Sequence, residues 1–333
     1  MAQLVQEERI AIIGSGGFGT VLAKMLAESG HTVYQWVRNP ELAQAMDKTR
    51  VNTKYLPGHK LPLNLWITTD VKSALADATM IVAAVPSFAM RETMRLVAPH
   101  LEPEAIVLNV AKGIEHDSYK RMSQVIQDEV PDGTSVATLS GPNLAEELAR
   151  GMPAGTIVAS EDKPCLPRLT KTFSTPFFKV YAWTDIIGVE LGGVLKNITA
   201  LAAGISDGFG FGNNSKSSLI TLGLQEMFTV GTRMGAKRST FFGLAGLGDL
   251  VATCSSPLSR NHFVGEHLAK GESMEQITKE LNGKVAEGVN ATRFVHGYAV
   301  REKITLPLTR EMFHILYENK PSKKAIVDLL ESV

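Results

Sequence analysis

The 333-residue sequence has few cysteines, no excess charge of either sign and no long run of apolar residues. Its two cysteines, Cys165 and Cys254, lie far apart and form no CxxC pair. A disulfide framework and a zinc site built on cysteine pairs are therefore excluded, and reduced cysteines are typical of a cytoplasmic protein. We predict a cytoplasmic location.

The charge balance and the apolar pattern exclude further classes of protein. Lys and Arg number 34, as do Asp and Glu, so the formal net charge is zero. Because nucleic-acid binders more often carry a basic excess, we predict no nucleic-acid partner. No apolar run approaches the roughly 18 residues of a membrane span, so we expect no membrane anchor. The eight histidines show no HExxH pattern, and we predict no metal.

The most informative local motif follows the first predicted strand. Residues 9–13 form an apolar strand, and residues 14–19 then read Gly-Ser-Gly-Gly-Phe-Gly before a predicted helix over 20–29 and a strand over 31–37. In this context the glycines let the turn close and let a pyrophosphate approach the backbone, while the helix N-terminus favours the anion. The motif predicts dinucleotide binding; the alternative is a glycine-rich turn without a ligand.

The end of the second strand bears on the choice of cofactor. NAD-specific folds often place an acid there for the ribose 2′-hydroxyl, whereas this chain has Arg38 and no acid before Glu41. An arginine can accept the 2′-phosphate of NADP, so we favour NADP, or the use of both NADP and NAD. The alternative is that Arg38 is a solvated surface residue or stacks on the adenine.

Strand and helix patterns alternate over the first half of the chain and give way to helices in the second. Alternation of this kind predicts an α/β fold whose N-terminal, Rossmann-like sheet is mostly parallel, followed by a C-terminal all-α domain. We place a dinucleotide-binding domain at 1–183 and a helical substrate and catalytic domain at 184–333. Lys112 and Gly141 directly follow strands, where such sheets bind ligands; the alternative for Lys112 is an exposed loop lysine. Further strands are predicted at 77–85, 105–110, 134–139, 156–159 and 177–181.

A long helix predicted over 183–206 carries a lysine on a face of small residues. Lys196 shares its face with Gly192, Gly193, Ala200 and Ala203. Each glycine within a helix costs about 1 kcal/mol relative to alanine, which suggests that something approaches the backbone there. The alternative is helix packing over the glycines with a solvated lysine.

Two segments further on place polar residues at predicted turns. Asp249 follows a glycine-rich turn, and Ser256 with Pro257 reads as the N-cap and first residue of a helix. Arg260 and Asn261 would then lie just inside a helix N-terminus, where an arginine can bind a phosphate bidentately. The alternative for Arg260 is an ion pair with a surface carboxylate.

Taken together, these motifs resemble the NAD(P)-dependent glycerol-3-phosphate dehydrogenase family, most closely its bacterial biosynthetic type. They follow the family order from residue 9 to about residue 292. The matching segments are Gly14-Ser15-Gly16-Gly17-Phe18-Gly19-Thr20, Ser140-Gly141-Pro142, Gly192-Gly193-Val194-Leu195-Lys196-Asn197, Ser206-Asp207-Gly208-Phe209-Gly210-Phe211-Gly212, Gly246-Leu247-Gly248-Asp249-Leu250 and Ser259-Arg260-Asn261.

The resemblance implies reversible NAD(P)H-dependent reduction of dihydroxyacetone phosphate to sn-glycerol 3-phosphate, which supplies glycerophospholipid synthesis. It also implies a homodimer. Catalytic roles are implied for Lys196, Lys112 and Asp249. Implied cofactor positions are Gly14, Ser15, Gly16, Gly17, Phe18, Gly19, Arg38, Lys112, Ala145, Arg260, Val285 and Glu287. Implied substrate positions are Lys112, Gly141, Asn143, Lys196, Asp249, Ser259, Arg260 and Asn261.

The implied roles agree with the chemistry of the side chains. An ammonium at Lys196 can stabilise negative charge on the ketone oxygen and donate a proton, and Asp249 can hold it by a charge-assisted hydrogen bond. Two alternatives remain at this point: a β-hydroxyacid dehydrogenase of the 6-phosphogluconate type, and a nicotinamide-binding sensor without catalysis. The segments around Asp249 and Arg260 argue against the first, and the presence of all three charged residues argues against the second.

Overall fold

The computed structural model describes residues 7–116, 118–281 and 286–331. Contacts divide the chain into two compact units, Met1–Ala111 with Lys120–Ile186, and Lys112–Tyr119 with Ile187–Val333. That the short segment 112–119 belongs with the second unit was not anticipated from the sequence. The functional division predicted at residues 183 and 184 stays a prediction.

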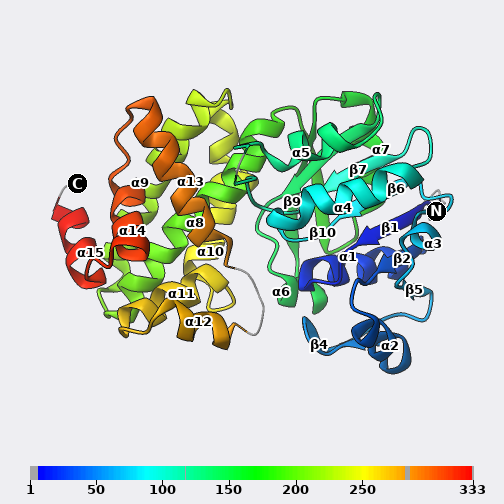
Figure 1. Cartoon of the computed structure of the whole chain (residues 1–333), viewed down its shortest axis with the longest axis horizontal. Coiled ribbons are helices and arrows are strands. Elements are labelled where there is room, and N and C mark those ends of the chain that lie inside the picture. Colours follow the sequence, from blue (N-terminus) through cyan, green and yellow to red (C-terminus); the bar gives the residue numbers. More distant parts are fainter. Residues whose placement is uncertain (1–6, 117, 282–285, 332–333) are drawn as a thin grey trace. The chain divides into compact units, whose positions relative to one another are not determined.

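The first unit is built on an eight-stranded sheet with the order β10-β9-β8-β7-β6-β1-β2-β5 (Figure 1). All neighbouring strands are parallel except β8 and β9. The predicted mostly parallel sheet is confirmed, whereas β5 and the small β3–β4 hairpin were not predicted. The strands are β1 (Arg9–Ile13), β2 (Thr32–Trp36), β3 (Val51–Asn52), β4 (Leu56–Lys60), β5 (Leu65–Thr68), β6 (Met80–Ala83), β7 (Ile106–Asn109), β8 (Ser135–Ser140), β9 (Ala154–Ser160) and β10 (Phe178–Trp183).

Both faces of this sheet are covered, which explains why its strands read as continuous apolar runs. In β1, Ile10 and Ile12 face a core shared with α1, α6 and α7, while Ala11 and Ile13 face a second core shared with α3, α4 and α5. The helices of this unit are α1 (Gly17–Glu28), α2 (Pro40–Thr49), α3 (Val71–Leu75), α4 (Met90–Val97), α5 (Met122–Glu129), α6 (Ala145–Ala149) and α7 (Leu166–Phe173), with 3-10 turns η1 (Ser87–Ala89), η2 (Ala98–His100) and η3 (Lys163–Cys165).

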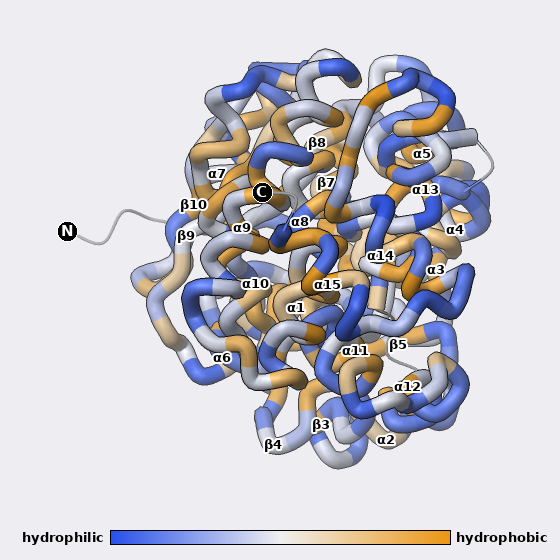
Figure 2. The backbone as a smooth tube through the Cα atoms, turned by 90° about the vertical axis from the view of Figure 1, so that its left-hand side faces the viewer, coloured by the Kyte–Doolittle hydropathy of each residue, from blue (hydrophilic) through white to orange (hydrophobic). Residues whose placement is uncertain are grey.

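The second unit is helical in its described residues, as predicted. Its core gathers apolar residues of α8, α9, α13 and α14 around the buried Leu191, Leu201 and Met312. Hydrophobic and hydrophilic stretches alternate along these helices (Figure 2). The elements are α8 (Ile186–Gly208), α9 (Gly212–Arg233), η4 (Arg238–Phe242), the π-helical turn η5 (Leu244–Gly248), α10 (Asp249–Ser255), α11 (Arg260–Ala269), α12 (Met274–Glu280), α13 (Glu287–Glu302), α14 (Pro307–Glu318) and α15 (Ser322–Glu331).

Helix α8 is the most apolar helix of this unit, and it corrects one expectation. By length and composition alone it could cross a membrane, with a mean hydropathy of 1.4, although we expected no such stretch. However, 94% of the apolar 18-residue stretch of this helix is buried inside the protein. Burial of this extent is what a core helix requires.

Two predicted boundaries differ from the structure. The helix that we placed at Ser256 and Pro257 begins instead at Arg260, because the Ser259 hydroxyl caps it by accepting from the His262 N–H. Ser256 ends α10. The long helix predicted over 183–206 is α8, which spans Ile186–Gly208, and α9 begins shortly after it at Gly212.

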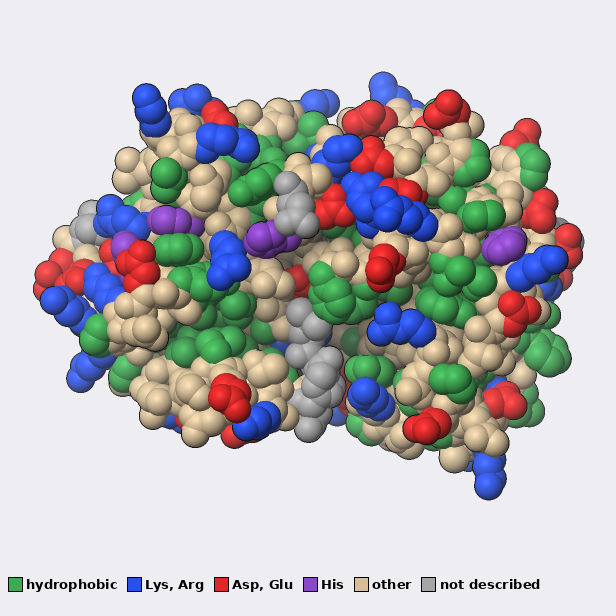
Figure 3. All heavy atoms as spheres, in the orientation of Figure 1, with side chains coloured by type: hydrophobic (Ala, Val, Ile, Leu, Met, Phe, Trp, Pro, Cys, Tyr) green, Lys and Arg blue, Asp and Glu red, His purple; other side chains and the backbone are tan. Residues whose placement is uncertain are grey.

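Charged side chains are mixed over the surface. On the face drawn in Figure 3, Lys and Arg side chains are interspersed with Asp and Glu. This mixing agrees with the zero net charge of the sequence.

Candidate functional site

The glycine turn between β1 and α1 has the backbone geometry that the motif predicts. Gly14 adopts φ 121°, and a Cβ there would lie 2.5 Å from the Ala84 carbonyl oxygen, so only glycine fits. A Cβ on Gly19 would lie 2.8 Å from the Cβ of Ala84, which keeps α1 close to β6. Gly16 precedes α1, and a Cβ there would meet no atom within 4 Å. The start of α1 is thus open to an anion such as a pyrophosphate.

Three buried polar side chains, those of Thr20, Gln35 and Asn52, form hydrogen bonds with this turn. Gln35 on β2 donates to the Gly14 carbonyl at 2.9 Å, and Asn52 on β3 donates to the Ser15 carbonyl at 2.8 Å. Both amides also donate to the Thr20 hydroxyl. The sequence analysis missed Gln35 and Asn52, because neither belongs to the glycine motif.

The other predicted cofactor residues of the first unit lie on different elements. Arg38 is exposed just beyond β2 and, among the described residues, forms no hydrogen bond or ion pair. Ala145 begins α6, and its Cβ is 3.7 Å from where a Cβ on Gly17 would lie. Phe18 is half-buried and packs against the core of this unit.

Gly141 and Asn143 follow β8 and meet the same threonine. A Cβ on Gly141 would lie 2.9 Å from the Thr156 hydroxyl, so the backbone passes close to β9 there. The Asn143 amide donates to that hydroxyl at 3.0 Å. The Asn143 Oδ1 is buried and has no hydrogen-bond partner in the part of the chain that the structure describes, which leaves an acceptor for a ligand hydroxyl.

In the second unit two lysines meet one buried aspartate. Lys196 Nζ on α8 donates to Asp249 Oδ1 at 2.5 Å, and Lys112 Nζ donates to Asp249 Oδ2 at 2.6 Å. Lys196 also donates to the Thr253 hydroxyl at 2.5 Å. Thr253 lies one helical turn after Asp249 on α10, so the two side chains share a face of this helix. Thr253 was not among the predicted site residues, although this spacing could have indicated it. The predicted hydrogen bond between Asp249 and Lys196 is confirmed.

Burial changes the acidity of this lysine. Lys196 is only 5% exposed. Desolvation lowers the pKa of Lys196 to about 8, and the negative charge of Asp249 opposes this effect. The alternative interpretation, a solvated lysine, is therefore wrong, because Lys196 is buried and its pKa lies well below that of a lysine in water.

The glycine face of α8 explains how Asp249 reaches Lys196. A Cβ on Gly192 would lie 2.2 Å from the Ala245 carbonyl oxygen, so the π-helical turn η5 packs directly on the glycine. Asp249 is the first residue of α10, immediately after η5. Close packing on Gly192 thus brings the aspartate to the lysine one turn further along α8.

A second set of contacts surrounds the start of α11. Asn261 donates to the Asn197 side chain at 2.8 Å and accepts from the Gly288 N–H at 2.9 Å. It thereby joins α8, α11 and the first turn of α13. Asn197, which pairs with Asn261, was not among the predicted site residues.

Arg260 and Glu287 are the first residues of α11 and α13. Among the described residues the Arg260 guanidinium forms no hydrogen bond or ion pair. Desolvation lowers the pKa of Arg260, and the charge of Glu287 opposes the shift. Val285 lies outside the described residues.

The charges of these residues favour an anionic ligand. Lys112, Lys196 and Arg260 carry three positive charges, against two negative charges on Asp249 and Glu287. These five residues therefore carry a net positive charge, and the N-terminus of α11 adds a further feature that favours a phosphate.

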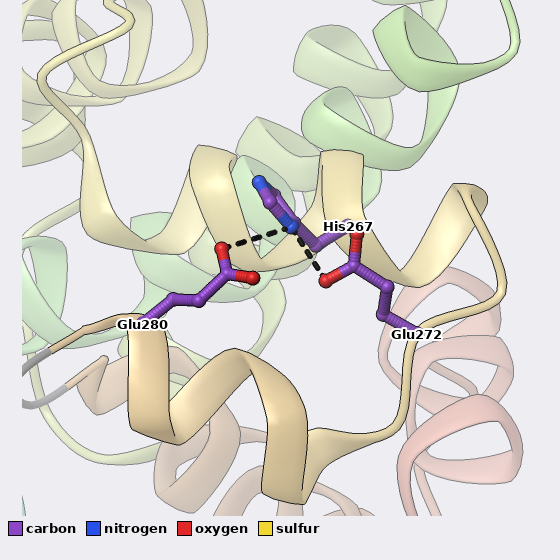
Figure 4. A group of neighbouring side chains, drawn as sticks. All are labelled: His267, Glu272 and Glu280. Atoms are coloured by element: carbon purple, nitrogen blue, oxygen red, sulfur yellow. Dashed lines mark hydrogen bonds and ion pairs between the residues drawn. The ribbon is translucent and has the colours of Figure 1, made fainter.

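A separate group consists of His267 at the end of α11, Glu272 and Glu280 (Figure 4). His267 Nδ1 lies 2.7 Å from Glu272 Oε2 and 3.5 Å from Glu280 Oε2. The shorter contact is a hydrogen bond, so a proton on the imidazole accounts for the arrangement. We assign no metal to it, and the predicted absence of a metal stays a prediction.

A family model described as the N-terminus of NAD-dependent glycerol-3-phosphate dehydrogenase matches residues 9–166, and one described as its C-terminus matches residues 185–327. A glycerol-3-phosphate dehydrogenase [NAD(P)+] from Geobacter sp. (strain M21) is 42% identical over 325 residues, covering 97% of both chains. One from Prosthecochloris aestuarii is 44% identical over 323 residues, covering 96% of this chain and 97% of its own.

A crystal structure of glycerol-3-phosphate dehydrogenase from Coxiella burnetii superposes with a TM-score of 0.93 at 36% identity, covering 98% of this chain and 99% of that one. Sequence and fold therefore agree with the glycine turn and the lysine–aspartate cluster, and the chain belongs to the NAD-dependent glycerol-3-phosphate dehydrogenase family.

Proposed function

We propose that the protein catalyses the NAD(P)H-dependent, reversible reduction of dihydroxyacetone phosphate to sn-glycerol 3-phosphate. The observation that carries this proposal is the buried Lys196, held by Asp249 in a chain of this family. The family match also disfavours the two alternatives, a dehydrogenase of the 6-phosphogluconate type and a sensor without catalysis.

Lys196 is the proposed proton donor to the substrate ketone. When bound, NAD(P)H supplies the hydride. As the ketone carbon is reduced, negative charge develops on its oxygen, and an ammonium with a pKa of about 8 can stabilise that charge and transfer its proton. Asp249 and the Thr253 hydroxyl hold Nζ in one direction. Lys112, on the other oxygen of Asp249, adds positive charge.

The start of α11 is the proposed phosphate site. Arg260 supplies a guanidinium that forms no hydrogen bond or ion pair with the described residues, and its own backbone N–H and that of Asn261, in the first turn of the helix, supply further donors. Asn261 holds this turn against α8 and α13. Binding the phosphate positions the ketone, because the two groups belong to one small molecule.

The glycine turn is the proposed cofactor site, and Arg38 is the residue proposed to favour NADP. Gly14, Ser15, Gly16, Gly17, Phe18, Gly19 and Ala145 are proposed to form the cofactor site of the first unit. Lys112, Arg260 and Glu287 of the second unit stay predicted cofactor positions. Gly141, Asn143 and Ser259 complete the proposed substrate contacts. We further propose that the enzyme supplies glycerophospholipid synthesis, acts in the cytoplasm and forms a homodimer.

The assay that tests the function follows cofactor absorbance with purified protein, dihydroxyacetone phosphate, and NADH or NADPH in parallel. We expect cofactor oxidation only when the phosphate ester is present, and faster oxidation of NADPH than of NADH. Binding of both cofactors without oxidation would refute the proposed substrate. A higher rate with NADH would refute the role given to Arg38.

A further inference from the structure

Asn52 lies outside the glycine motif, but its side chain makes three hydrogen bonds at the glycine turn. Its amide donates to the Ser15 carbonyl at 2.8 Å and to the Thr20 hydroxyl at 2.9 Å. Its Oδ1 accepts from the Tyr55 N–H at 3.1 Å. Asn52 is 0% exposed, so all of its polar atoms are satisfied within the protein.

These bonds hold both sides of the turn. Ser15 lies inside the turn, and Thr20, in the first turn of α1, is 0% exposed. The bond to Tyr55 sets the β3–β4 hairpin, whose Tyr55 carbonyl lies so close to Gly17 that a Cβ on Gly17 would be 2.9 Å from it. One amide therefore connects the hairpin, the turn and the start of the helix.

We propose that Asn52 is a positioning residue for the phosphate-binding turn. By engaging the Ser15 carbonyl on the protein side, it keeps the peptide groups of the turn oriented so that their N–H groups remain available to a pyrophosphate. The inference rests on the proposed cofactor site. The ligand class is a dinucleotide bound through its pyrophosphate, the part that NADH and NADPH share.

This role predicts a specific pattern of affinities. Asn52→Ala leaves the Ser15 carbonyl without its amide donor, and the turn can rearrange. Because Asn52 acts on the part of the site that faces the pyrophosphate, the dissociation constants of NADH and NADPH should rise by the same factor, about tenfold. The ratio of the two constants should stay unchanged. A residue that contacts the 2′-phosphate would change that ratio instead.

The experiment measures both dissociation constants by titration calorimetry, together with the melting temperature and kcat at saturating cofactor. Asn64→Ala is the matched control, because Asn64 also donates from a side-chain amide to a backbone carbonyl, that of Ala27 at 2.8 Å. We expect the control to keep wild-type affinities. Equal affinities in Asn52→Ala and wild type, or a changed ratio of the two constants, would overturn the inference.

A second pair of variants covers the case in which Asn52→Ala does not fold. Thr20→Val removes the hydroxyl that Asn52 and Gln35 share while keeping the size of the side chain, and Thr20→Ser retains the hydroxyl. We expect weaker binding of both cofactors only in Thr20→Val. Unchanged binding in Thr20→Val would overturn the inference. If the wild-type protein binds neither cofactor, the proposed cofactor site itself is wrong.

Discussion

At the scale of single residues, the environment of Lys196 determines its chemistry. Lys196→Ala should lower kcat about 10²–10⁴-fold, the usual range for loss of a general acid, while the affinity for cofactor survives. Steady-state kinetics and cofactor titration measure the two effects. Lys279→Ala, an exposed lysine on α12, serves as the control and should be neutral. Turnover near wild type in Lys196→Ala would remove the lysine from the mechanism.

The same lysine predicts the pH dependence of the reductive reaction. The proposed proton donor is the ammonium of Lys196, so kcat/KM should fall as the pH rises through about 8, the pKa of this lysine. Asp249 raises this pKa, so Asp249→Asn should move the falling limb to lower pH. Rates measured from pH 6 to pH 10 test both statements. A limb that stays in place in Asp249→Asn would contradict the electrostatic coupling.

Arg260 should act on substrate binding rather than on the chemical step. Arg260→Ala removes charge-assisted hydrogen bonds to the phosphate, and we expect KM for dihydroxyacetone phosphate to rise about ten- to hundredfold. Arg301→Ala, an exposed arginine on α13, is the control. An unchanged KM in Arg260→Ala would place the phosphate elsewhere.

Single residues were predictable from the sequence where a local pattern surrounds them. The turn from Gly14 to Gly19 is local, and its strand and helix are visible on either side. The bond from Lys112 to Asp249 joins residues 137 positions apart, and no spacing reveals it. Lys112 and Asp249 were predicted as site residues from the resemblance to a family, but their contact is seen only in the structure.

At the scale of elements, the packing of η5 on α8 can be tested through one methyl group. Gly192→Ala would put a Cβ 2.2 Å from the Ala245 carbonyl, so we expect about 1–3 kcal/mol less free energy of unfolding and a lower kcat, as Asp249 is displaced. The control is Gly297→Ala on α13, where the nearest atom would be 3.8 Å away. That variant should gain up to about 1 kcal/mol from helix propensity.

Urea unfolding and steady-state kinetics measure the two glycine variants. If Gly192→Ala is as stable and as active as wild type, close packing on Gly192 does not place Asp249. The close approach predicted at the mid-helix glycines is confirmed at Gly192. The segment η5 was predicted as a simple turn, because no sequence pattern marks a π-helical turn. The start of α11 was misplaced because serine favours the N-cap position and the chain offers both Ser256 and Ser259 there. The structure shows that the Ser259 hydroxyl makes the capping hydrogen bond, with the His262 N–H.

At the scale of the whole molecule, a buried carboxyl group makes stability depend on pH. Glu226 on α9 accepts from the N–H groups of Leu308 and Thr309 at the start of α14. Burial raises the pKa of Glu226 from 4.5 to about 7. Between these values the folded protein retains a proton that the unfolded chain has lost, so this group's contribution to stability falls as the pH rises through that window.

Glu226→Gln cannot ionise and should lose this dependence. We expect the stability of wild type relative to the variant to decrease by at most about 3 kcal/mol from pH 4.5 to pH 7, and to change little above pH 7. Thermal unfolding at a series of pH values measures the difference. Parallel pH profiles for the two proteins would contradict the assignment.

The whole fold was largely predictable, because periodicity changes from strands to helices near the middle of the chain. The sheet order and the antiparallel pairing of β8 with β9 were not, since pairing depends on contacts between distant strands. The placement of residues 112–119 with the second unit could likewise not be predicted from the sequence.

That placement has a consequence for exchange between relatives. A chimaera joined at residues 186 and 187 would take the helices from one parent and Lys112 from the other, so the two cations on Asp249 would have different origins. Recombination at this one crossover thus divides the lysine–aspartate cluster between the parents. Two further crossovers, one on each side of residues 112–119, would take the whole cluster from one parent.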